Sequence, residues 1–138
     1  LAEAFGNLGS VHTLVVHAED GLDEISIAAP TRVSEYKDGN LMDFTIKPDD
    51  FGLATQALDT IRVESAEESL ELIRQALDGH PGPAYDMVML NAGATLYAAD
   101  LAHSLSEGVL NARAILDSGA ALEKLEEMTA YTQQFEKS

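Results

Sequence analysis

The pattern of apolar and polar residues changes twice within the first twenty positions. Leu1, Phe5 and Leu8 recur at helical spacing, which predicts a helix that ends before Gly9. Residues 11–16 form a short run rich in valine, which predicts a strand buried on both faces, as in a parallel sheet. An acidic stretch follows at once. The pattern therefore places this stretch at the carboxyl end of a strand, where open α/β sheets bind ligands.

A hairpin is predicted next. Residues 32–37 and 41–47 have strand-like patterns, and Asp38-Gly39-Asn40 joins them with a strong turn signal. Apolar and polar residues alternate in the second of these strands, which predicts one solvated face. Pro48 then begins a single helical turn. Since a parallel strand and an antiparallel hairpin do not complete a sheet, we expect further strands, either unrecognised here or in sequence outside this chain.

The remaining pattern is helical. Ser65 and Ser104 are each followed three residues later by glutamate, a capping box that predicts a helix start. Gly79 and Gly119 are the predicted helix ends. Residues 84–101 are apolar nearly all round, which predicts a helix in the middle of the core. With one more helix after Gly119, the sequence predicts an α/β fold with one buried parallel strand, a β-hairpin and about five helices.

Composition limits the class of protein. The 138 residues predict a single domain, 1–138, and a hydrophobic fraction of 46% suits a globular core. Eight Lys and Arg against 24 Asp and Glu give a net charge of −16, which disfavours nucleic acid and membrane partners. No apolar run is long enough to span a membrane, and no signal peptide is visible. The absence of cysteine fits a reducing compartment, so we expect a cytoplasmic protein.

Asp23 and Glu24 are the strongest candidates for chemistry. Mg²⁺ prefers one or two carboxylates together with substrate phosphates and water, and an adjacent acidic pair on a turn provides such ligands. A second interpretation is that both residues cap a following short helix. His17 ends the predicted strand. It either points into the same crevice as the acidic pair, with a metal-binding or acid/base role, or is bonded to backbone. The other three histidines show no ligand spacing, so we interpret His12, His80 and His103 as structural or surface residues.

The usual phosphate-binding and nucleophile motifs are absent from the sequence. It has no P-loop, no dinucleotide fingerprint, no serine nucleophile elbow and no cysteine nucleophile. The sequence of residues 79–83 contains glycines, but its two prolines remove amide donors, so it is interpreted as a connector. The residues alone therefore predict metal-binding carboxylates without a phosphate cradle.

Residues 15–26, Val-Val-His-Ala-Glu-Asp-Gly-Leu-Asp-Glu-Ile-Ser, resemble the V-V-H-G-x-D-G-L-D-E-I-S segment of anthranilate phosphoribosyltransferases. Four more family segments are matched in the same order. They are T-x-V-x-E at residues 31–35, P-E-D-F-G-L at 48–53, L-N-A-A-A-A-L-Y at 90–97, and S-G-K-A-x-x-K-L at 118–125. The chain departs from the family at Ala18, where glycine is usual, and in the residues before Ser65.

The resemblance implies a phosphoribosyltransferase of the nucleoside phosphorylase/phosphoribosyltransferase fold type, acting in tryptophan biosynthesis. It implies transfer of the phosphoribosyl group of phosphoribosyl diphosphate to anthranilate, with Mg²⁺ held by the residues that match Asp23 and Glu24. The family's glycine-rich phosphate loop, most anthranilate contacts and the helical dimerisation domain lie upstream. We therefore expect this chain to be the carboxyl-terminal portion of a larger α/β catalytic domain, inactive alone, within a homodimer.

Three alternatives remain open at this point. A pyrimidine-nucleoside phosphorylase has a similar fold, although Gly21-Leu22-Asp23-Glu24 favours the first interpretation. A non-catalytic relative could act as a nucleic-acid-binding module, which the net charge argues against. A stand-alone interaction protein could complete its sheet with a partner or a second copy.

Overall fold

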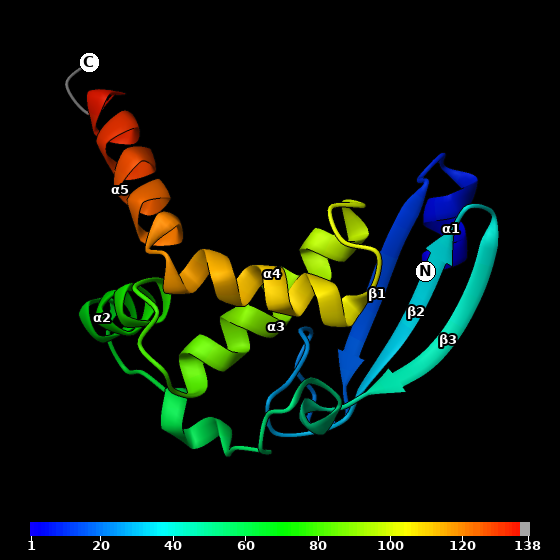
Figure 1. Ribbon diagram of the computed structural model, residues 1–138, viewed down its shortest axis with the longest axis horizontal. Coiled ribbons are helices and arrows are strands. Elements are labelled where there is room, and N and C mark those ends of the chain that lie inside the picture. The colour runs from blue at the N-terminus through cyan, green and yellow to red at the C-terminus, as the bar shows by residue number, and fades with distance from the viewer. Residues whose placement is uncertain (136–138) are drawn as a thin grey trace.

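The computed structural model describes residues 1–135, and Figure 1 shows a small sheet beside a group of helices. In chain order the elements are α1 (Ala2–Asn7), β1 (His12–Ala18), β2 (Thr31–Lys37), β3 (Asn40–Ile46), the 3-10 turns η1 (Pro48–Phe51) and η2 (Leu58–Ile61), α2 (Ala66–Leu77), α3 (Pro83–Ala98), α4 (Leu105–Asp117), α5 (Ala120–Thr132) and the turn η3 (Gln133–Phe135). The predicted α/β class with five α-helices is confirmed for the described residues.

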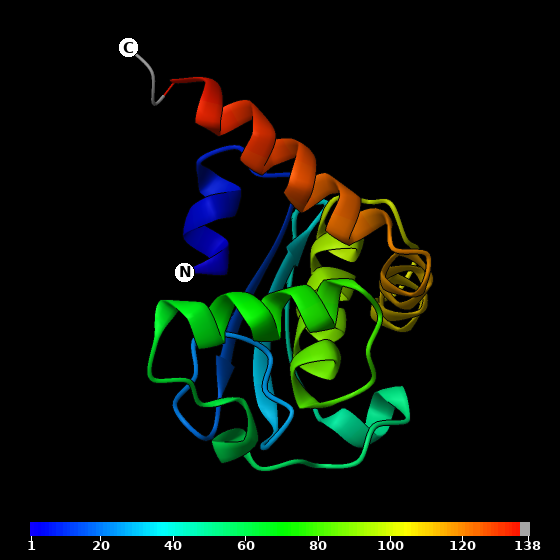
Figure 2. The same ribbon diagram turned by 90° about the vertical axis from the view of Figure 1, so that its left-hand side faces the viewer.

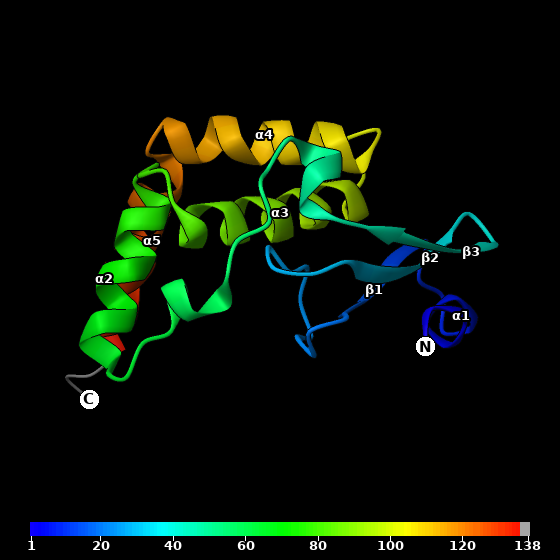
Figure 3. The ribbon, with the colours of Figure 1, turned by 90° about the horizontal axis from the view of Figure 1, so that it is seen from below.

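The three strands form one sheet in the order β1-β2-β3, and both pairs run antiparallel. The prediction of a buried parallel strand is therefore wrong for the pairing within this chain. The apolar run of β1 has another cause. Helix α3 packs near one face of the sheet and α1 covers the other face at one end, as Figure 3 shows, so β1 is half-buried for most of its length without a parallel neighbour. Its second edge pairs with no strand among residues 1–135.

Strand register decides which side chains enter the core. Val16, Val33 and Phe44 stand opposite one another on the three strands. Val33 is buried in the hydrophobic core, and Val16 and Phe44 are partly buried and pack against it. The alternate residues of each strand point to the other face. The hairpin is confirmed, because Asp38 (φ 49°) and Gly39 (φ 83°) form a two-residue turn with positive φ at both positions.

The capping boxes are confirmed as helix starts, with a shifted second bond. Ser104 Oγ accepts the Glu107 backbone N–H at 3.1 Å, while the Glu107 carboxylate accepts the N–H of His103, one residue before the cap, at 2.7 Å. Ser65 accepts the Glu68 N–H at 3.1 Å in the same way. Both helices therefore begin where the sequence predicts, at residues 66 and 105.

Helix α3 is the central helix, as the pattern predicts. Its side chains Met89 and Leu90 are almost fully buried. It joins the sheet at one end to α2 at the other, an arrangement that Figures 1 and 2 show from two sides. α3 and α4 pack closely at Gly93 and Gly108, because a Cβ at Gly108 would lie 2.2 Å from the Gly93 carbonyl oxygen. Within residues 1–135, no helix has the length and apolar character needed to cross a bilayer.

Candidate functional site

The acidic pair lies in the loop of residues 19–30 that connects β1 to β2. Asp23 and Glu24 are both exposed, and Figure 1 places the loop at the lower end of the sheet, beside the helices. No helix begins between β1 and β2. The interpretation of the pair as caps of a short helix is therefore wrong for these residues.

The turn before the pair is built by Gly21 and Asp20. Gly21 has φ 96°, a left-handed conformation that glycine adopts without steric cost. The Asp20 carboxylate accepts the backbone N–H of Leu22 at 3.2 Å and the hydroxyl of Ser26 at 2.5 Å. Asp20 is thus occupied in shaping the loop, a role that the sequence alone did not indicate.

The loop after the pair is fixed to the core. Ile25, Ser26 and Ile27 are buried, and the Ser26 N–H donates to the Thr31 hydroxyl at 3.1 Å. The amide of Asn91, on α3, accepts the Ile25 N–H at 2.9 Å and donates to the Ile25 carbonyl oxygen at 2.9 Å. Sequence reasoning missed Asn91, because its contact with Ile25 spans 66 residues.

His17 does not share the crevice proposed from the sequence. Its ring is exposed, and it forms no hydrogen bond or ion pair within residues 1–135. Register puts it opposite Arg32, whereas the preceding pair, Val16 and Val33, faces the core. Both interpretations of His17, as a crevice ligand and as a backbone-bonded strand end, are therefore unsupported.

His12 is structural, as the sequence predicts. Its side chain is 2% exposed and lies between two carboxylates, 2.9 Å from Glu35 and 3.0 Å from Asp100, with its ring edge-on to Tyr97. Lys37 lies 3.2 Å from Asp100. The hydrogen bonds from Lys37 and then His12 hold the pKa of the Asp100 carboxyl below its usual value. This cluster joins β1, β2 and the end of α3 at the opposite end of β1 from the acidic pair.

His80 and His103 are exposed, in line with the surface interpretation. His80 lies 3.4 Å from Asp78, just beyond α2. The backbone N–H of His103 serves the α4 cap described above. Neither side chain forms a hydrogen bond or ion pair with the loop of residues 19–30 in the described part of the chain.

The acidic pair offers oxygen donors of the kind that Mg²⁺ binds. Glu19 lies 3.6 Å from Arg32 and Asp20 is hydrogen-bonded, but Asp23 and Glu24 have no ion pair or hydrogen bond among the described residues. Their carboxylates are free, hard oxygen donors next to each other. No group of three or more potential ligands occurs within residues 1–135. A pair of carboxylates fits a hydrated Mg²⁺ shared with a phosphate ligand better than a metal enclosed by protein.

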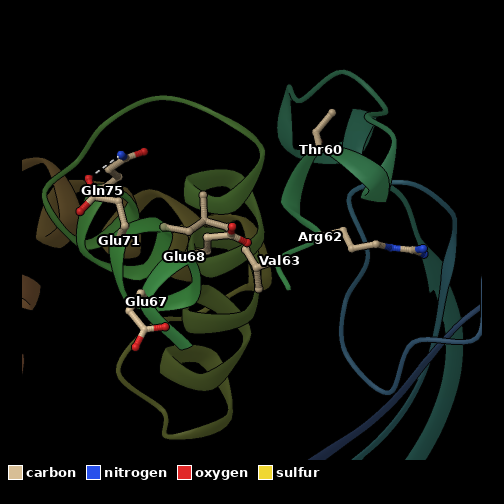
Figure 4. A pocket seen from close by; sticks show the side chains of 8 residues that line it. Thr60, Arg62, Val63, Glu67, Glu68, Glu71 and Gln75 are labelled. Carbon is tan, nitrogen blue, oxygen red and sulfur yellow. Dashed lines mark hydrogen bonds between the residues drawn. The ribbon is translucent and has the colours of Figure 1, made fainter. Parts of the chain in front are cut away.

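A wide hollow lies elsewhere, between η2 and α2. It has a volume of about 500 Å³ and is lined by Glu67, Glu68 and Glu71 from one helix face, with Arg62 across it. Figure 4 shows that the Arg62 side chain extends away from these glutamates. The hollow is open, acidic and without convergent donors, so it does not resemble an anion site.

The fold defines the class of this chain as a mixed α/β domain, with an exposed acidic pair on the loop that follows β1. Residues 1–122 match the model of the glycosyl transferase family, a/b domain. The chain therefore belongs to the glycosyl transferase family, and the match takes in most of its length.

The similar curated proteins are anthranilate phosphoribosyltransferases, which confirms the resemblance seen in the sequence. The protein from Thioalkalivibrio sulfidiphilus is 57% identical over 96% of this chain, and the one from Chromohalobacter salexigens is 55% identical over 96%. The alignments cover 39% and 38% of those proteins. The chain thus spans about two fifths of the length of these relatives.

Solved structures agree. The anthranilate phosphoribosyltransferase of Thermus thermophilus superposes with a TM-score of 0.85 at 38% identity, over 96% of this chain and 39% of that one. The Saccharomyces cerevisiae enzyme, in complex with PRPP and Mg, gives a TM-score of 0.71 at 27% identity, over 83% of this chain and 33% of that one. The phosphoribosyltransferase type of fold is therefore confirmed.

Proposed function

We propose that this chain is the carboxyl-terminal portion of the α/β catalytic domain of an anthranilate phosphoribosyltransferase. The whole protein transfers the phosphoribosyl group of phosphoribosyl diphosphate to anthranilate, in the cytoplasm, as a homodimer. Asp23 and Glu24 hold Mg²⁺. One observation carries the proposal: in a chain of this family, two adjacent carboxylates are exposed and unpaired among residues 1–135, on a loop whose main chain is hydrogen-bonded on both sides of the pair.

The reaction is a substitution at the anomeric carbon of the ribose. The anthranilate amine forms a C–N bond as the C–O bond to pyrophosphate breaks, the pyrophosphate takes the electron pair, and the amine loses a proton. Mg²⁺, when bound, neutralises charge that develops on the leaving pyrophosphate. The part of this chain would be to hold the cation through the carboxylates of Asp23 and Glu24, where it would stabilise negative charge on the substrate.

The relatives favour this activity over the alternatives. Proteins that are 57% and 55% identical to the chain are anthranilate phosphoribosyltransferases, which supports that activity over a nucleoside phosphorylase. The net charge of −16 opposes binding of nucleic acid. Because the chain contains no phosphate-binding glycine motif, the rest of the whole protein has to hold the pyrophosphate, and we expect this chain alone to be inactive.

The test is to replace Asp23 by Asn and Glu24 by Gln together in the whole protein. We expect Mg²⁺-dependent transferase activity to fall by about 100-fold or more, since the metal supplies several kcal/mol of charge stabilisation. The free energy of unfolding should stay within about 0.5 kcal/mol of wild type, because both side chains are exposed and unbonded in the described structure.

A matched control is Glu126→Gln with Glu127→Gln, an adjacent and exposed acidic pair on α5. It removes the same formal charge far along the chain from the loop and should leave activity unchanged. Full activity of the Asp23→Asn, Glu24→Gln variant across a Mg²⁺ titration would refute the proposed metal site.

A further inference from the structure

The main chain is held on both sides of the acidic pair. On the amino-terminal side, the Leu22 N–H donates to Asp20 at 3.2 Å and the Leu22 carbonyl accepts the Ala18 N–H at 3.0 Å. On the carboxyl-terminal side, both polar groups of the Ile25 backbone bond to the Asn91 amide. Asp23 and Glu24 are therefore the two exposed residues between two fixed points.

The Asn91 amide uses both of its N–H donors and its oxygen in hydrogen bonds here. Its oxygen accepts the Ile25 N–H at 2.9 Å. Its NH₂ group donates to the Ile25 carbonyl at 2.9 Å and to the Met87 carbonyl at 3.0 Å, one turn back on α3. This pattern fixes the orientation of the amide, since exchange of its oxygen and nitrogen would set donors against a donor and acceptors against acceptors.

Asn91 is carried by α3, which packs into the core. This helix contacts α4 at Gly93, two residues after Asn91, and presents Met89 and Leu90 to the core. Ile25 itself is 4% exposed. No helix or strand forms between β1 and β2. The position of the loop relative to α3 is therefore set by the packed core and by the two hydrogen bonds of 2.9 Å from Asn91 to Ile25.

We infer that Asn91 is a positioning residue for the metal site: it fixes the Ile25 backbone and so sets where the carboxylates of Asp23 and Glu24 stand. This inference rests on the proposed function. Asn91 touches no metal in this scheme. It lowers the cost of binding because the loop is ordered before the cation arrives.

The experiment measures Mn²⁺ affinity, in place of Mg²⁺, by electron paramagnetic resonance on the whole protein. Asn91→Ala removes both bonds to Ile25 and should weaken the Mn²⁺ Kd about tenfold with the number of sites per folded chain unchanged. The control is Thr95→Ala, one turn further on the same helix, which removes a bond from an exposed hydroxyl to the Asn91 carbonyl and not to the loop. Its Kd should equal that of wild type.

A merely structural role predicts a different result. Partial unfolding would lower the number of Mn²⁺ sites and leave the Kd of the folded molecules unchanged. If Asn91→Ala does not fold, Asn91→Gln decides, because it retains an amide displaced by one methylene and should also weaken the Kd.

The outcomes separate the two claims. An unchanged Kd in the folded Asn91 variants, together with a weakened Kd in Asp23→Asn, Glu24→Gln, overturns the positioning role and leaves the proposed function standing. An unchanged Kd in the acidic-pair variant overturns the metal site itself.

Discussion

Helices α3 and α4 cross at a point where no side chain separates their backbones, and Gly108→Ala tests how tightly this contact is specified. A Cβ at Gly108 would lie 2.2 Å from the carbonyl oxygen of Gly93 and 3.0 Å from its carbonyl carbon. These are backbone atoms of α3, so no rotamer change relieves the overlap. The helices must separate by a substantial part of an ångström, and Val109, 3% exposed at the same crossing, would lose packing as well.

The expected loss follows from two opposed terms. Overpacking costs about 1–3 kcal/mol, and a contact between two backbones belongs at the upper end of that range. Alanine gains at most about 1 kcal/mol over glycine in helix propensity. The net destabilisation is therefore about 2 kcal/mol, which lowers the urea midpoint by about 1 M for an m-value near 2 kcal/mol/M.

The assay is urea unfolding followed by far-ultraviolet circular dichroism, with Gly82→Ala as the control. Gly82 has an extended backbone (φ 162°), and a Cβ there meets no atom within 4 Å. Because Gly82 is the N-cap of α3, where alanine is less favourable than glycine, we expect Gly82→Ala to cost less than about 1 kcal/mol. A Gly108→Ala protein as stable as wild type would refute the argument that this crossing requires glycine.

Two further predictions concern buried polar groups. His12→Ala leaves the Glu35 carboxylate, 7% exposed, without its partner at 2.9 Å, and should lower the free energy of unfolding in urea by about 3 kcal/mol. The control, His103→Ala at an exposed site, should cost less than about 0.5 kcal/mol. Equal effects would contradict the assignment of His12 as structural. Burial, and then the carboxylates of Asp117 and Glu35, raise the pKa values of Tyr85 and Tyr97 to about 12. Because tyrosines of the unfolded chain ionise near pH 10, this stabilisation is complete below about pH 10 and is lost as pH rises towards 12. The free energy of unfolding should therefore fall between about pH 10 and pH 12, and it should fall less steeply in Tyr85→Phe than in wild type. A free energy of unfolding that does not change with pH in this range would show that folding does not raise the pKa of the two hydroxyls.

Local signals in the sequence determined most element boundaries. The helix starts at residues 66 and 105 follow from Ser65 and Ser104, whose hydroxyls satisfy backbone N–H groups within their own first turn. The hairpin follows from Asp38-Gly39, since the turn conformation is set by those residues themselves. Each of these signals acts over a few residues, so no tertiary information was needed.

Strand pairing required the tertiary structure. The apolar run at residues 11–16 indicates only that both faces of a strand are partly covered. Helices on the two sides of an antiparallel sheet produce that covering as well as the helices of a parallel sheet do. The sequence therefore identified β1 as a strand but not its direction relative to β2.

For the acidic loop, too, the sequence determined one part of the description and the tertiary structure the other. The sequence by itself predicted Asp23 and Glu24 as candidate metal ligands, because two adjacent carboxylates after a glycine turn are visible as residue types. Only the tertiary structure showed that the Asp20 carboxylate is hydrogen-bonded to Leu22 and Ser26, and that the Asn91 amide is hydrogen-bonded to the backbone of Ile25, 66 residues away in the sequence. The residue types that can bind a ligand are visible in the local sequence, whereas the residues that fix their geometry are brought together only by the packing of distant segments.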